Sequence, residues 1–221
     1  MFGADGANAD ATFTAEKELI KKIIGKYNIA RSATLFGAVI YDTDANLAIR
    51  FGDVYSKENA KNAIGRLQRR RAGNNLVRGL EVARDRLFDE KNGARRNVPK
   101  TLIVFVDKKS SNEEIVKMAT VAKQLQDSGV KLIVIGIGSK VDKKQLSAVA
   151  SDSTTLFKPP TLESLENVLS KVAEASRPGK FKLLLHNNLR ITCRFAKKKG
   201  NLLKTSMGSN CSLYLSLGFP N

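Results

Sequence analysis

The sequence predicts an α/β fold in which a doubly wound, mostly parallel sheet carries helices on both faces. Two patterns support this prediction. Runs of strand length alternate along the chain with stretches whose apolar residues recur every three or four positions. The runs 101–107 and 130–138 are apolar throughout, which is typical of strands covered by helices on both faces. We therefore expect one main domain over residues 1–176 and a C-terminal extension over 177–221.

The start of the main domain predicts a helix followed by a hairpin. Residues 14–27 have helical spacing, with Thr14 as the expected cap and Glu16 in the first turn. The β-rich runs 34–42 and 47–53 are joined by a turn-forming TDAN segment. They predict two adjacent strands.

The rest of the domain predicts helices arranged around the two central strands. Between those strands, residues 110–129 show a serine cap, two acids in the first turn and Gly129 as a stop. The remaining stretches continue the alternation, so we expect the sheet to be wound on both sides. They are the helices 56–67, 75–88, 142–150 and 161–175 and the short strand 154–158.

Composition excludes several classes of protein. The 221 residues are 42% hydrophobic and 27% charged, and no apolar run approaches the roughly 20 residues that cross a bilayer. The first residues, MFGADGANAD, lack the basic start and the apolar stretch of a secretory signal. If the domain is extracellular, we expect the export signal to belong to a longer parent protein.

The formal net charge of +17 is unevenly distributed. Residues 177–221 contain nine Lys or Arg and no acid, which leaves 29 basic and 21 acidic residues, a net of +8, for residues 1–176. His186, Cys193 and Cys211 also lie in the extension. The main domain therefore has no residues for zinc or thiol chemistry or for a Ser-His-Asp triad, and we expect no enzyme.

The extension opens with a helix-stopping Pro-Gly pair and then changes composition. One interpretation is a polyanion-binding arm that attracts an acidic polysaccharide rather than nucleic acid. The other is a poorly ordered extension without a binding role. The candidate polyanion-binding residues are Arg190, Arg194, Lys197, Lys198 and Lys199.

In a doubly wound sheet, ligands bind where loops converge at the carboxyl ends of the strands. The loops expected there carry DGANA, RRRAGNNL and VDKKSS. These segments, with AGNNLVRGLEVARDRLF, NGARRNVPKTLIVFVDKKSSN and SGVKLIVIGIG, resemble the von Willebrand factor A family in the expected order. The resemblance covers residues 1 to about 175 and is most specific to the extracellular matrix branch, the matrilins and type VI collagens.

The resemblance implies a position for the family's metal-ion-dependent adhesion site, which uses a DxSxS motif, a threonine and an aspartate. Those positions fall on Asp5, Ala7, Ala9, Asn74 and Asp107. Mg²⁺ prefers about six oxygen ligands, and an alanine supplies none. We therefore expect a vestigial site and no resident cofactor. The alternative is weak Mg²⁺ binding completed by extra waters.

Residues beside these positions could contact a ligand. Arg69, Arg70 and Arg71 could hold a partner's carboxylate where the ion would have been, or could simply form a solvated charge run. Asn75 could face a ligand, but Asn74 or Asn75 is also placed to cap the helix that follows.

One departure from the family concerns its central first strand, which enters the DxSxS motif through five or six apolar residues. Here only four residues precede Asp5. We expect that strand to be all but missing and the chain to be a fragment. The resemblance implies a non-catalytic module that binds a matrix protein without a metal. The alternatives are an intracellular scaffold whose basic extension binds nucleic acid, and a cation-dependent adhesion domain with an altered site.

Overall fold

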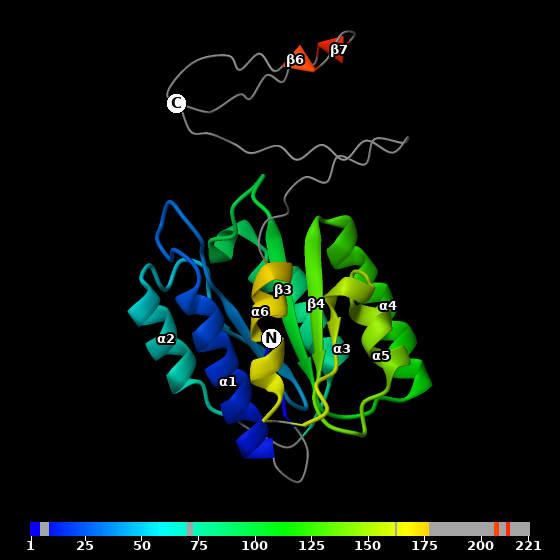
Figure 1. The fold of residues 1–221 in the computed structure, drawn as a ribbon. Coiled ribbons are helices and arrows are strands. Elements are labelled where there is room, and N and C mark those ends of the chain that lie inside the picture. Colours follow the sequence, from blue (N-terminus) through cyan, green and yellow to red (C-terminus); the bar gives the residue numbers. More distant parts are fainter. Residues whose placement is uncertain (5–8, 70–72, 162, 177–205, 208–210, 213–221) are drawn as a thin grey trace. The chain divides into compact units, whose positions relative to one another are not determined.

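The computed structural model describes residues 1–4, 9–69, 73–161, 163–176, 206–207 and 211–212 (Figure 1). The chain divides into two compact units, residues 1–179 and 180–221. In the second unit, β6 (Ser206–Met207) pairs antiparallel with β7 (Cys211–Ser212). All five candidate polyanion-binding residues lie outside the described residues, and so do His186 and Cys193.

The first unit alternates strands and helices largely as the sequence predicts (Figure 1). Ser56, Ser111 and Asp142 cap the helices that follow them, because the side chain of each accepts a backbone N–H of the first turn. The helices are α1 (Ala9–Gly25), α2 (Lys57–Arg66), α3 (Leu76–Val82), α4 (Asn112–Asp127), α5 (Lys143–Val149) and α6 (Leu165–Ala175), with short helical turns η1 (Ala83–Leu87), η2 (Glu90–Asn92) and η3 (Ser153–Thr155). The strands are β1 (Ala38–Tyr41), β2 (Ala45–Ile49), β3 (Lys100–Val106), β4 (Val130–Gly136) and β5 (Leu156–Phe157).

The strands form two ladders. β3, β4 and β5 are parallel in the order β3-β4-β5, and β1 and β2 form the predicted antiparallel hairpin. Alternate residues of β3 and β4 face opposite cores, as expected for strands covered on both sides. Leu102 and Val104 pack in the core that contains α3, α4 and α5, whereas Phe105 packs in the core that contains α1, α2 and α6.

Met1 and Phe2 lie between the two ladders and bond to both. They occupy the position of a central strand between β1 and β3. Met1 bonds to β3: its amino group donates to the Ile103 carbonyl at 2.6 Å and its carbonyl accepts the Phe105 N–H at 3.3 Å. Phe2 bonds to β1: its N–H donates to the Val39 carbonyl at 2.9 Å and its carbonyl accepts the Tyr41 N–H at 2.9 Å.

Several predicted boundaries were wrong. α1 begins at Ala9 rather than at residue 14, so Thr14 lies inside the helix and does not cap it. The first strand of the hairpin begins at Ala38 rather than at residue 34, and Leu35–Gly37 instead line a cavity beside Met1 and Phe2. No helix in the described part of the chain is long and apolar enough to span a membrane.

Candidate functional site

The candidate site lies at the carboxyl ends of the parallel strands. Asp107 directly follows β3, Ala9 is the first residue of α1, and Asn74 stands two residues before α3. Asp5 and Ala7 lie outside the described residues. The ends of β1 and β3 are tied together at this edge, since the Tyr41 hydroxyl donates to the Phe105 carbonyl at 2.5 Å.

The described part of this site does not fit a magnesium ion. Ala9 is buried and presents a methyl group where the family offers a hydroxyl. Asn74 contributes one amide oxygen, Oδ1, which is buried and accepts no hydrogen bond from the described residues. Asp107 contributes a carboxylate that is partly buried. Two oxygen-bearing side chains fall short of the roughly six oxygens that Mg²⁺ prefers, and no cluster of three or more His, Cys, Asp or Glu in the described residues could hold a metal.

Glu16 is the residue at this end of the sheet whose environment the sequence prediction missed. Its side chain is fully buried, and neither carboxylate oxygen has a hydrogen-bond partner among the described residues. Burial, reinforced by the nearby charge of Asp107, raises its pKa well above the usual range. The Met1 amino group and the Gly3 amide act in the opposite direction without reversing this effect.

A sequence signal for this burial existed. Glu16 precedes Leu19, Ile20 and Ile23 by three, four and seven positions, which places it on the apolar face of α1. The prediction placed Glu16 in the first turn, as an acid near the positive end of the helix dipole, because it started the helix five residues too late. The corrected start puts Glu16 in the middle of the buried stripe.

Two further polar groups are buried with Glu16. Burial lowers the pKa of the Met1 amino group to about 5, so at neutral pH it is mainly an uncharged amine. The Tyr41 hydroxyl has its pKa raised, first by burial and then by the charge of Glu16. The position between β1 and β3 is thus surrounded by ionisable groups whose pKa values differ from those of their exposed counterparts.

Arg69 does not belong to a purely solvated charge run. Its Nε donates to Oδ1 of Asp10 at 2.9 Å, and Asp10 lies in the first turn of α1 next to Ala9. The structure therefore brings Arg69 to the candidate site, although α2 and α1 are separate in sequence. Arg70 and Arg71 lie outside the described residues.

Asn75, and not Asn74, caps α3. Its side-chain oxygen accepts the Arg78 N–H at 3.0 Å, and its Nδ2 donates to the Thr43 carbonyl at 3.4 Å. The capping interpretation of Asn75 is therefore right. Asn74 remains the residue whose amide oxygen has no described partner.

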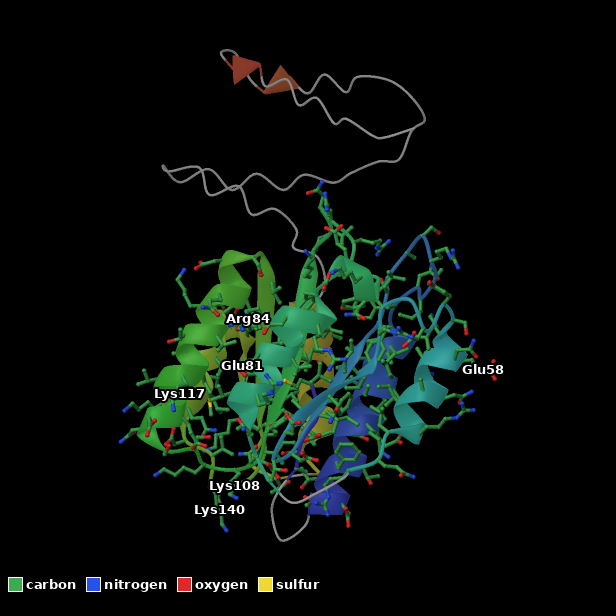
Figure 2. All side chains as sticks on the ribbon, turned by 180° about the vertical axis from the view of Figure 1, so that it is seen from behind. Glu58, Glu81, Arg84, Lys108, Lys117 and Lys140 are labelled. Carbon is green, nitrogen blue, oxygen red and sulfur yellow. The ribbon has the colours of Figure 1, made fainter. Side chains whose placement is uncertain are left out.

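Exposed lysines follow the two central strands at this end of the sheet. Lys108 and Lys109 follow β3 and Lys140 follows β4, and all three are exposed. Figure 2 shows both Lys108 and Lys140 at this end of the molecule. The loop after β3 is anchored by the buried Gln145, which accepts the Ser110 N–H at 3.0 Å and donates to the Lys108 carbonyl at 3.1 Å. This anchor was not predicted.

Comparisons with known proteins agree with this geometry. The von Willebrand factor type A domain model matches residues 6–171. Matrilin-1 of Gallus gallus is 26% identical over 154 residues, which are 69% of this chain and 30% of the relative. The collagen alpha-6(VI) chain of Mus musculus is 25% identical over 159 residues, which are 71% of this chain and 7% of the relative. The chain thus spans about a third or less of the length of these relatives.

Solved structures show the same fold. Proximal thread matrix protein 1 from the mussel byssus superposes with a TM-score of 0.68 at 25% identity, covering 76% of this chain and 42% of that one. Another structure of that protein, with a zinc-occupied adhesion motif, has a TM-score of 0.69 at 19% identity, covering 79% of this chain and 48% of that one. The second likeness concerns the fold alone.

Proposed function

Because the chain belongs to the von Willebrand factor type A family, we propose that it is a non-catalytic, protein-binding module of an extracellular matrix protein. Its similarity to matrilins and type VI collagens supports this proposal, and so does the matrix protein of the mussel byssus. The main domain lacks histidine and cysteine, which removes the commonest general bases and thiol nucleophiles. Export would place the module outside the cell as part of a longer parent protein.

We further propose that partner binding at the carboxyl ends of the strands does not depend on a metal. The observation that carries this proposal is the buried methyl group of Ala9 at a ligand position. Asn74 and Asp107 would then be remnants of the site, together with Asp5 and the alanine at position 7. Positive side chains at this end, including Arg69, Lys108 and Lys140, could attract a partner's carboxylate without an ion.

Charge reversal tests this binding surface. We expect Lys108→Glu combined with Lys140→Glu in the full chain to weaken binding to purified matrilins and collagens by roughly tenfold, because electrostatic attraction to an acidic partner is lost. Lys117→Glu is the matched control, since Lys117 is exposed on α4 and lies away from this end (Figure 2). Biolayer interferometry with and without EDTA gives the measurement. Binding that EDTA abolishes would contradict the proposal, and so would equal losses in both variants.

The basic extension is a second proposed contact, with acidic polysaccharide as its ligand. Nine basic residues and no acid within residues 177–221 support this proposal. Neutralising Lys197, Lys198 and Lys199 with glutamine should lower the salt concentration at which the full chain leaves a heparin column. Unchanged elution would show that these lysines do not bind the polysaccharide.

A further inference from the structure

Basic residues gather on three loops at the amino end of β3, opposite the candidate site. The loops are residues 26–37 between α1 and β1, residues 50–55 after β2, and residues 86–100, which lead into β3. Figure 1 shows the first of them at the end of the domain opposite the start of α1. Together they carry eight basic and three acidic residues, a net of +5, against +8 for the whole of residues 1–176. We call these three loops the amino-end surface.

Contacts between the loops hold the amino-end surface together. The Phe51 N–H donates to the Asn92 carbonyl at 3.0 Å, which joins the second loop to the third. The Arg31 guanidinium lies over the ring of Tyr55, 4.7 Å from its centroid, which joins the first loop to the second. The backbone that carries the charges is therefore ordered before a ligand arrives, and this lowers the entropy cost of binding.

Most of the positive charge on this surface is not neutralised within the domain. Arg50 pairs with Asp53 at 3.3 Å. Arg96 pairs with Glu90. The other six basic residues form no ion pair with a described residue, and they are Lys26, Arg31, Arg86, Lys91, Arg95 and Lys100. Their charge is available to an anionic ligand from outside the domain.

The side chains favour a sulfated polysaccharide over a protein or a nucleic acid. Five of the eight basic residues are arginines, whose planar guanidinium groups bind oxyanions such as sulfate through two parallel hydrogen bonds. A protein partner usually needs an apolar or aromatic anchor. Tyr55 is the only large hydrophobic side chain exposed on these loops, and Arg31 covers its ring. A single-stranded nucleic acid would need such a ring free for base stacking.

We propose that the amino-end surface binds a sulfated polysaccharide. The inference rests on the proposed extracellular function and adds a second kind of ligand to it. This ligand is held by the folded domain itself, separately from any contact made by the basic extension. It leaves the carboxyl ends of the strands free, so one domain connects a polysaccharide to a protein partner.

Heparin binding by the full chain tests this proposal. Arg31→Gln combined with Lys91→Gln removes two exposed charges from the amino-end surface. The variant should bind a heparin oligosaccharide roughly tenfold more weakly, with a shallower dependence of affinity on salt, because ionic contacts are lost. Isothermal titration calorimetry at several salt concentrations gives the measurement.

Two further variants serve as controls for net charge and for folding. Lys143→Gln combined with Lys144→Gln removes two exposed lysines from the start of α5 and should change the affinity less than about twofold. Arg31→Lys combined with Lys91→Arg keeps the charge and should retain most of the binding. Equal losses in the amino-end and α5 variants would overturn the proposal, because they would reflect net charge alone. A loss in the charge-preserving variant as large as in the neutral one would also overturn it.

Other polyanions identify the class of ligand. Desulfated heparin should bind roughly tenfold more weakly than heparin, because the sulfate oxygens are its main contacts. Single-stranded DNA that bound more tightly than heparin, and lost affinity in the amino-end variant, would assign the surface to nucleic acid against the proposal. Polyglutamate with the same behaviour would assign it to an acidic protein, again against the proposal.

The basic extension and the proposed function give distinct results. If neutralising Lys197, Lys198 and Lys199 abolished heparin binding while the amino-end variant bound normally, the extension would be the binder and the proposal would be wrong. Intact binding to matrix proteins without any effect of the amino-end variant on heparin binding would reject the inference alone. Heparin binding at the amino-end surface without any matrix-protein binding would reject the proposed function instead.

Discussion

Replacing Glu16 with methionine should raise the free energy of unfolding by about 2 kcal/mol at pH 7, because the wild-type chain buries a carboxyl group whose oxygens have no hydrogen-bond partner at normal bonding distance among the described residues. Methionine is unbranched and fits an apolar helix face. The core around Glu16 contains Leu19, Ile20 and Ile23, so the new side chain replaces an unfavourable contact with an apolar one. Urea unfolding gives the measurement.

The gain should depend on pH in a defined direction. The folded pKa of Glu16 is raised above its ordinary value of 4.5, so below that value the carboxyl group is neutral in both states and costs little stability. Above it the unfolded chain releases the proton while the folded chain keeps it, and stability falls as pH rises. The advantage of Glu16→Met over wild type should therefore grow from pH 4 to pH 8.

Glu18→Gln provides the matched control for Glu16. Glu18 lies on the same helix, is exposed and pairs with Lys21. Removing the charge of Glu18 should change the free energy of unfolding by less than about 0.5 kcal/mol. A Glu16→Met variant that is less stable than wild type at pH 7 would show that the carboxyl makes a favourable interaction in the folded chain.

Extending the chain by five apolar residues before Met1 should produce the second large effect, a higher melting temperature at neutral and acidic pH. The extension converts the buried amino group into a peptide N–H and fills the cavity that Met1 and Phe2 border, between Leu35–Gly37 and Lys100–Ile103. The Met1 pKa is lowered from 8.0 to about 5, which corresponds to a cost of about 4 kcal/mol below pH 5 and roughly 1–2 kcal/mol at pH 7. At pH 7, removing the cost of the buried amino group should by itself raise the melting temperature by about 4 °C.

The stability cost of the buried Met1 amino group changes with pH in the opposite direction to the cost of the buried Glu16 carboxyl group. Between pH 8 and pH 5 the unfolded amine takes up a proton that the folded chain does not, so this group lowers stability as pH falls. Removing it should increase stability most at low pH. The apolar extension acts in two ways: it removes the buried amino group and it fills the cavity with apolar side chains. An extension of five glycines and serines separates these effects, because it removes the amino group without supplying apolar side chains. Identical melting temperatures for the apolar extension and the unextended chain would contradict the expected strand insertion.

Most of the fold could be predicted because local patterns dominate it. The uninterrupted apolar runs identified β3 and β4, and a serine cap followed by two acids placed the start of α4. The start of α1 was missed because Ala9 and Asp10 carry no apolar signal, and small residues are compatible with both loop and helix. Boundaries that depend on a neighbouring strand, as at Leu35–Gly37, cannot be read from local sequence.

The candidate site was predictable in position but not in chemistry. Asp107 and Asn74 stand at the expected ends of elements, since the order of strands and helices fixes where loops meet. The burial of Glu16 beside Met1 depends on how α1 packs against the first residues of the chain. The pairing of Arg69 with Asp10 joins residues 59 positions apart. Such long-range contacts follow from packing rather than from spacing along the chain.

Calorimetric titration of the full chain with Mg²⁺ tests the proposed metal independence most directly. The variant that combines Ala7→Ser, Ala9→Ser and Asn74→Thr restores the three hydroxyls and serves as the positive control. We predict no binding heat at micromolar Mg²⁺ for the unchanged chain and measurable binding for the restored variant. Micromolar Mg²⁺ binding by the unchanged chain that disappears in Asp107→Ala would contradict a metal-independent site.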